Sequence, residues 1–198
     1  MKNLVIIISL LMVGLMSCKK NISFTKDHLD FSTDTVLFDT VFTTVGSTTK
    51  RLKIYNYNNQ PINIDAIELM GGVSSPFRIN VDGVPGTYLS NVEIPANDSL
   101  FTFVEVTLEV NNASNPLVIS DSIRFETNGL SQYVNLDVWG QDAYFHADTV
   151  VAGLWQNDKP HVLYGTVAVG FPGIDSNTTL TIPAGTQVFC HKDAQLIV

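Results

Sequence analysis

Residues Leu100–Leu108 read LFTFVEVTL and form the strongest strand signal of the chain. Six of these nine residues are Phe, Thr or Val, the aromatic and β-branched side chains that favour a pleated strand. No stretch after residue 18 sustains the 3.6-residue period of a helix. We therefore expect an all-β protein built around this strand.

Further strand signals lie on both sides of it. Residues 49–57 place Leu52 and Ile54 on one face and charged or tyrosine side chains on the other. Residues 62–69 alternate until the apolar phase shifts after Ala66, which predicts a bulge. Other short strands are expected before the Asp82-Gly83 turn, around Ile123 and around Leu136.

About seven or eight short strands with turns every 8–12 residues are typical of a β-sandwich. The order of motifs resembles the immunoglobulin-like domains of cilia- and centrosome-associated proteins and of many bacterial surface proteins. That resemblance covers residues 45–142 and predicts a sandwich over 29–142 that acts as a spacer or partner platform without catalytic residues. The matching motifs are Leu52–Asn56 with Pro61-Ile62, Phe77–Ile79, Ile94–Ser99, Val104–Val106 and Val134–Gly140.

Residues 143–198 differ in composition and resemble the opening of a right-handed parallel β-helix. Short apolar strands recur there, with Gly185 at an expected corner; they contain Leu180, Ile182, Val188, Leu196 and Val198. One rung of a β-helix cannot bury its own apolar face, and at least three are needed. We therefore expect a partial, truncated β-helix and a chain that is a fragment of a longer lipoprotein.

The N-terminal residues 1–17 have the features of a signal peptide. Lys2 precedes an apolar run over 4–15 that is too short to span a bilayer of ~30 Å. The tetrapeptide Leu15–Cys18 resembles the bacterial lipobox, which implies cleavage after Ser17 and lipidation of Cys18, including a palmitate-type acyl chain. The alternatives are an ordinary secretory signal, although Leu15 suits its cleavage site poorly, and an uncleaved anchor.

Residues 18–28 then form a polar tether from the lipid to the folded chain. Because Lys19 is not an aspartate, the resemblance favours the outer membrane, with a periplasmic or a surface-facing orientation. Two or three acyl chains hold a protein on a bilayer, since each buried CH₂ adds ~0.8 kcal/mol. The sequence therefore predicts the membrane as a partner, through the lipid anchor.

Composition restricts the remaining partners. The net charge is −8 and the only Lys/Arg cluster is at residues 50–53, so nucleic-acid binding is disfavoured. The chain has two cysteines, and lipidation of Cys18 leaves Cys190 without an intrachain partner. We expect no disulfide, and we expect Cys190 to lie in a core as a small hydrophobe.

No catalytic motif occurs in the sequence. Phosphate loops and nucleophile elbows are missing, and the histidines form no HExxH or His-x-His pair; they are His28, His146, His161 and His191. We interpret them as solvated or core residues and expect no metal, no cofactor and no enzymatic activity.

Five tripeptides follow the pattern Asp-Ser/Thr-aliphatic and resemble an O-glycosylation consensus of some Gram-negative bacteria. Their hydroxyl residues are Thr35, Thr40, Ser99, Ser122 and Thr149. Chance recurrence in a Thr- and Asp-rich β protein explains the pattern equally well.

Four aromatic residues gather near the expected domain junction: Trp139, Tyr144, Phe145 and Trp155. Burial between two β-domains is the favoured interpretation and a sugar-stacking platform is the alternative. The leading hypothesis is a lipid-anchored envelope protein with a non-catalytic binding or scaffolding role, whose partner is a glycan or an envelope protein. The alternatives are a carbohydrate-active β-helix enzyme with catalytic rungs beyond Val198, and a glycan-binding or adhesin subunit.

Overall fold

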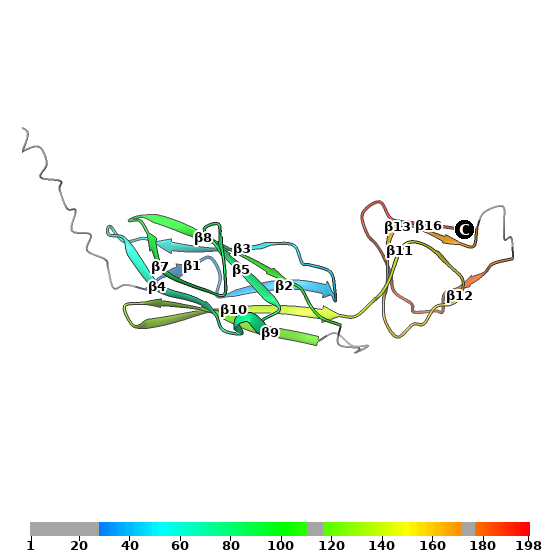
Figure 1. Ribbon diagram of the computed structural model, residues 1–198, viewed down its shortest axis with the longest axis horizontal. Helices are drawn as coiled ribbons and strands as arrows, with labels where there is room; N and C mark the ends of the chain where they lie inside the picture. Colours follow the sequence, from blue (N-terminus) through cyan, green and yellow to red (C-terminus); the bar gives the residue numbers. More distant parts are fainter. Residues whose placement is uncertain (1–27, 111–116, 172–176) are drawn as a thin grey trace, which may run out of the picture.

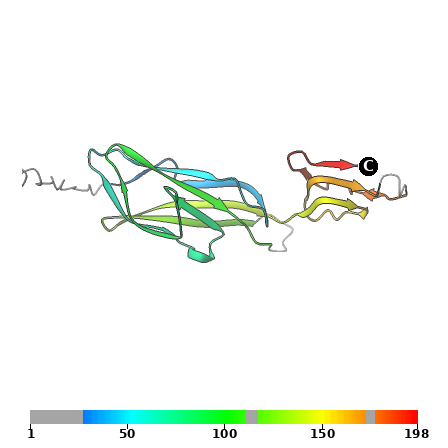
Figure 2. The same cartoon turned by 45° about the horizontal axis from the view of Figure 1, so that its top comes forward.

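The computed structural model describes residues 28–110, 117–171 and 177–198, so the predicted signal peptide and Cys18 lie outside the described residues. Within these ranges the regular elements are strands and a single 3₁₀ turn at Gly72–Ser74. Figures 1 and 2 show an elongated molecule in which a two-layered sandwich is followed by a smaller group of strands. The all-β prediction is confirmed.

The first layer is a five-stranded sheet with the order β1-β3-β8-β5-β6, and all of its pairs are antiparallel. Its members are β1 (Asp30–Phe31), β3 (Lys50–Asn56), β8 (Asp98–Val106), β5 (Phe77–Val81) and β6 (Val84–Pro85). The expected Asp82-Gly83 hairpin joins β5 to β6, and both turn residues have the positive φ that a two-residue hairpin turn requires.

The second layer has the order β2-β10-β9-β4-β7. Its members are β2 (Thr35–Phe42), β10 (Leu130–Gln141), β9 (Leu117–Thr127), β4 (Ile62–Leu69) and β7 (Tyr88–Ile94). Strand β2 runs parallel to β10, whereas the other pairs are antiparallel. Strand β2 is continuous through Asp39 and Thr40.

Strand β8 shows why this sequence forms a sandwich. Its side chains alternate strictly, with Thr102, Val104 and Val106 buried and with Phe101 and Phe103 exposed. Such a period-two pattern turns one face of the strand toward the second layer. In the sheet, β8 occupies the central position, between β3 and β5.

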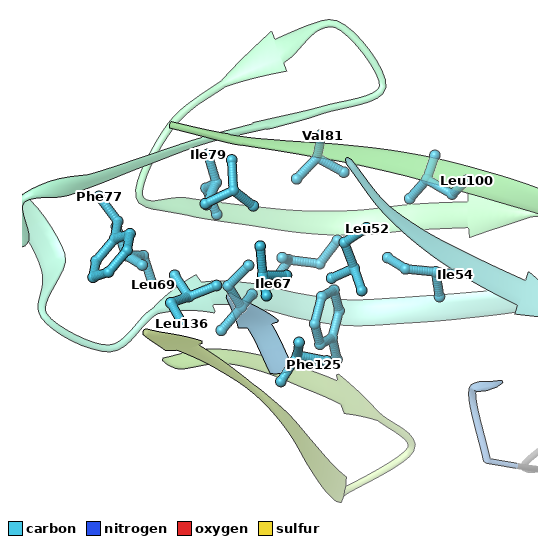
Figure 3. Packing of buried hydrophobic residues seen from close by; sticks show 14 of the residues in the cluster. Leu52, Ile54, Ile67, Leu69, Phe77, Ile79, Val81, Leu100, Phe125 and Leu136 are labelled. Atoms are coloured by element: carbon cyan, nitrogen blue, oxygen red, sulfur yellow. The ribbon is translucent and has the colours of Figure 1, made fainter. Parts of the chain in front are cut away.

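The core of the sandwich fills the space between the two layers. Leu52 and Ile54 from β3 face Ile67 from β4 and Phe125 from β9 in Figure 3. Each of these side chains is at most 1% exposed. Fully burying one such side chain contributes ~1.5–3 kcal/mol, so this core is the main source of stability of the sandwich.

The predicted phase shift in β4 is present. Ile64 and Ile67 both belong to the core although three positions separate them. The pairing with β7 nevertheless keeps a constant register, because β7 is irregular at the same level, where Asn91 has φ 55°. The two strands change phase together, so the expected one-sided bulge is replaced by a matched irregularity.

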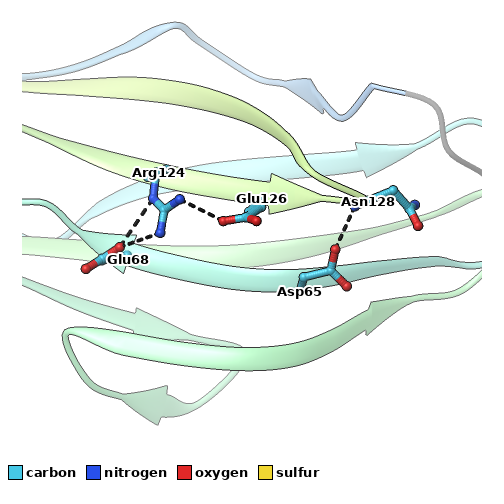
Figure 4. Close-up of polar contacts among 5 residues, drawn as sticks. All are labelled: Asp65, Glu68, Arg124, Glu126 and Asn128. Carbon is cyan, nitrogen blue, oxygen red and sulfur yellow. Dashed lines mark hydrogen bonds and ion pairs between the residues drawn. The ribbon is translucent and has the colours of Figure 1, made fainter.

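The outer face of the second layer carries an ionic network (Figure 4). The guanidinium group of Arg124 on β9 donates to Glu68 on β4 and to Glu126, each at 2.7 Å. Hydrogen bonding to Glu68 is the main reason why the pKa of Arg124 is raised above the ordinary value of an arginine. The cross-strand register places Glu68 directly opposite Arg124, so the network adds to the β4–β9 pairing.

The smaller group of strands pairs only in parallel. Strand β13 (His161–Val169) lies beside β11 (Tyr144–Val151) and, on its other side, beside β15 (Val188–Cys190) and β16 (Gln195–Ile197). A second small sheet pairs β12 (Gly153–Leu154) with β14 (Leu180–Thr181). Gly185, at the expected corner, has φ 87°.

Candidate functional site

A pocket of about 200 Å³ opens in the smaller group of strands. Tyr144 and His146 alternate along β11 and therefore point to the same side. The parallel register sets His161 of β13 directly beside Tyr144. The complete lining consists of Tyr144, His146, Leu154, Trp155, Gln156 and His161.

Three rings form the wall of this imidazole pocket. The rings of His146 and His161 are nearly coplanar, with centroids 5.2 Å apart and planes 4° apart. The indole of Trp155 stacks over both of them, at 4.1 Å from His161 and 4.7 Å from His146. Trp155 and His161 are 5% and 2% exposed, so the pocket has a rigid back and His146 lies nearer its mouth.

Hydrogen bonds indicate the tautomers of the two imidazoles. His161 Nε2 lies 2.8 Å from the carbonyl oxygen of Gln156, which can only accept, so this nitrogen carries the hydrogen. His161 Nδ1 is then an acceptor, and His146 Nε2 donates to it across 2.9 Å. In this pairing of tautomers, His146 Nδ1 is left as an acceptor.

The electrostatics of the pocket keep His146 neutral. Burial lowers the pKa of His146 from its ordinary value of 6.5, and the neighbouring His161 lowers it further because two adjacent imidazolium charges repel. At the rim, the Tyr144 hydroxyl donates to Asp158 at 3.1 Å. Burial and this hydrogen bond raise the pKa of Tyr144.

The arrangement suits ligand binding by stacking and hydrogen bonding. The half-buried imidazole of His146 and the phenol of Tyr144 offer polar groups beside an aromatic wall. Among residues 28–110, 117–171 and 177–198 no group of three or more His, Cys, Asp or Glu side chains could hold a metal ion. The imidazole nitrogens that face each other are already used by their mutual hydrogen bond.

Sequence reasoning did not pair His146 with His161. The two residues are 15 positions apart, and no local motif links them. They meet because β11 and β13 pair in parallel. This pairing sets His161 beside Tyr144, which lies two residues before His146 on the same face of β11. The core interpretation is confirmed for His161, whereas His191 is exposed and stacks on Tyr164 at 4.6 Å.

The predicted glycosylation residues all lie on strands and are not brought together into one site. Thr35 and Thr40 are on β2, Ser99 on β8, Ser122 on β9 and Thr149 on β11. Thr40 and Thr149 are exposed and the other three are partly buried. Their modification stays a prediction, as does lipidation of Cys18.

The expectation that Cys190 lies in a core is wrong. The residue is exposed, as are its neighbours in β15. Strand β15 pairs with β13 on one side and has no strand on its other side among the described residues. A side chain on such an outer strand lacks the second neighbour that would bury it.

The aromatic junction also differs from the expectation. Trp139 and Phe145 are 42% and 36% exposed, and Trp155 is buried within the imidazole pocket instead. The side chain that joins the two parts is Phe42 at the end of β2. It contacts Phe145 and Phe189 at centroid distances of 6.4 and 5.4 Å.

No family model and no curated protein matches the sequence. In fold, 54 solved chains are similar to it. One is a family 123 glycoside hydrolase from Clostridium perfringens, with a TM-score of 0.39 and 11% identity over 57% of this chain. Another is a protein of unknown function from Porphyromonas gingivalis W83, with a TM-score of 0.39 and 12% identity over 63%. The chain covers 25% of the first protein's length and 60% of the second's.

A third similar structure is a PapD-like domain of human CEP192, with a TM-score of 0.37 and 7% identity. That likeness covers 64% of this chain and 96% of the domain. The neighbours also include a pilin subunit. Within the described residues no helix is long and apolar enough to cross a bilayer.

Proposed function

We propose that this protein is a lipid-anchored envelope protein with a non-catalytic binding and scaffolding role. In this proposal Cys18 carries the lipid and residues 18–28 are the tether. The immunoglobulin-like sandwich over 29–142 is a spacer, and residues 143–198 begin a β-helix that presents the imidazole pocket. The favoured location is the outer membrane, on its periplasmic or its surface side.

The observation that carries the proposal is the continuous connection between the two parts. Only Asp142 and Ala143 separate β10 from β11. Asp142 is 2% exposed, and its Oδ2 accepts a hydrogen bond from Lys159 Nζ at 3.4 Å. With Phe42 packed across the junction, this connection supports a rigid spacer that holds the second part in a constant orientation.

The parallel pairings support the β-helix. Successive passes of the chain lie side by side in one sheet: Tyr144, His161 and Val188 are aligned on β11, β13 and β15, and residues 149, 167 and 196 are aligned on β11, β13 and β16. Strands β12 and β14 form a second parallel sheet with the same order along the chain. Such a recurrence of aligned strands, each turn stacked on the previous one, is the arrangement of a parallel coil.

The anchor is tested by palmitate labelling and cell fractionation of the protein in a Gram-negative host. We expect the wild-type chain to incorporate label and to sediment with the membranes. Cys18→Ala should lose both properties, whereas Cys190→Ala should keep both. Label that persists in Cys18→Ala would disprove the anchor.

The binding role is tested with a photo-crosslinking residue at Leu154, which is 61% exposed and lines the imidazole pocket. The control position is Val73, which is 86% exposed on the sandwich. A discrete adduct at position 154 that is lost in Cys18→Ala supports anchored binding. An identical adduct pattern at both positions argues against a role for the pocket.

A further inference from the structure

The outer face of the first sheet combines aromatic rings with cations. Along β3, Arg51, Lys53 and Tyr55 point outward, and along β8 so do Phe101 and Phe103. The register places Arg51 opposite Phe103 and Lys53 opposite Phe101. These five side chains, here called the cation–aromatic face, therefore form one continuous surface.

The contacts within this face are short and specific. Lys53 Nζ lies 4.9 Å from the Tyr55 ring centre and 5.4 Å from that of Phe101. The Arg51 guanidinium lies 6.0 Å from the Phe101 ring. The Phe101 and Phe103 rings are 6.3 Å apart and 22° from parallel, although 38% and 36% of each residue is exposed. The rings lie along the sheet and remain open to a partner.

The charge of the face is opposite to that of the chain, whose net charge is −8. Within the described residues the ion pairs involve other cations, so Arg51 and Lys53 have no carboxylate partner. The nearby Glu105 accepts a hydrogen bond from Thr49 at 2.6 Å. An anionic partner would therefore supply the missing counter-charges.

A hollow of about 180 Å³ extends the face toward β5 and β6. Phe103, Arg78, Asn80 and Glu105 line it, and the register places Glu105 opposite Arg78. Arg78 is oriented by donating to the carbonyl oxygens of Ser75 and Phe77, at 2.5 and 2.7 Å. A third cation is thus held beside the aromatic pair, across the sheet from Arg51 and Lys53.

We propose that the cation–aromatic face binds an acidic polysaccharide. Sugar rings present C–H groups that stack on aromatic side chains, and uronate carboxylates pair with ammonium and guanidinium groups. Outward residues recur every ~6.8 Å along a strand, which suits a polymer with repeated acidic units. This site is separate from the imidazole pocket and does not depend on lipidation.

Two other partners fit the face less well. An extended peptide pairs with the edge of a sheet, whereas this face lies on central strands whose backbone groups are already paired. A membrane surface is best met by apolar side chains that project outermost, but here the cations lie over the rings. An acidic polysaccharide can stack on the aromatic rings and pair with the cations at the same time.

The test measures binding of the full-length protein, in detergent micelles, to polygalacturonate, with dextran as the neutral control. We expect binding to polygalacturonate alone, weakened by added salt. The double variant Arg51→Gln/Lys53→Gln and the variant Phe103→Ser should each lower the affinity about tenfold or more. The matched controls Lys192→Gln and Tyr88→Ser, on other exposed surfaces, should keep the wild-type affinity.

A footprint on the unmutated protein gives a second measurement that does not depend on variant folding. Polygalacturonate should slow acetylation of Lys53 and leave exposed Lys192 unprotected. Equal affinity for dextran, unchanged affinity in the face variants, or no protection of Lys53 would each overturn the proposal. Binding to phosphatidylglycerol vesicles, lost in the same variants and without polysaccharide binding, would overturn it in favour of a membrane surface.

Discussion

The paired imidazoles of His146 and His161 show how a residue's role depends on its neighbours. Each is an isolated histidine in the sequence, and solvated or core positions were the reasonable expectation for both. The parallel register brings their rings together under Trp155, and the Gln156 carbonyl determines which nitrogens carry hydrogen. Sequence alone does not contain this arrangement, because it requires the alignment of two strands and of the turn between them.

We expect stability to decrease as the pH falls below about 6.5, the ordinary pKa of histidine. The folded pKa of His146 is lowered, so the unfolded chain binds a proton at a higher pH than the folded chain does. The contribution of neutral His146 is therefore complete above the unfolded pKa and is lost as the pH falls toward and through the folded pKa. Thermal unfolding as a function of pH checks this.

The variant His146→Phe keeps a ring against Trp155 but cannot titrate, so its unfolding temperature should depend less on pH. His191→Phe, at an exposed ring-stacked histidine, should keep the wild-type dependence. The explanation fails if His146→Phe and the wild-type protein show the same pH profile.

Single strands were the most predictable features of this protein. The alternation of β8 follows directly from its sequence, and so does the change of phase in β4. The matching irregularity at Asn91 on β7 was not predicted. The positive φ of Asn91 can be interpreted only once β7 is known to pair with β4. A similar bend in β11 and β13 depends on Asp148, whose Oδ1 accepts from the Thr166 amide at 2.8 Å.

We expect Gly165→Ala to destabilise the protein by about 2 kcal/mol or more. Gly165 has φ 60°, and an added Cβ would lie 2.0 Å from Asp148 Oδ1. Moving that carboxylate would break its bond to Thr166 and disturb the β11–β13 bend. Chemical denaturation measures the effect. Gly46→Ala is the control, because its Cβ would find its nearest neighbour at 3.8 Å and no strained φ is involved; equal losses in both variants would contradict the explanation.

At the scale of the whole molecule, the sandwich and the smaller group of strands meet at a junction where side chains of both are in contact. From the sequence we expected the junction to be filled by aromatic residues that are close together in the chain, between Trp139 and Trp155. The contact is made instead by Phe42, about a hundred residues upstream of Phe145, because β2 pairs in parallel with β10 and ends beside β11. Only the tertiary pairing brings that side chain to the junction.

We expect Phe42→Ser to loosen the junction without unfolding the sandwich, because Phe42 lies at the end of its strand and is partly exposed. Small-angle X-ray scattering should then show a broader distribution of overall dimensions. The control Leu37→Ser, at a residue of the same strand that is 50% exposed, should match the wild-type curve. Superimposable curves for Phe42→Ser and the wild-type protein would show that Phe42 does not stiffen the junction.

The sequence by itself determined the all-β class, the main strands and the Asp82-Gly83 hairpin, because alternation and turn residues act over a few positions. It also placed a cation-bearing face on Arg51 and Lys53 opposite Leu52 and Ile54. Only the tertiary structure decided that Phe101 and Phe103 lie beside those cations, that Cys190 is exposed, and that Phe42 reaches the junction. These outcomes depend on strand order and register, which are set by packing between residues far apart in the chain.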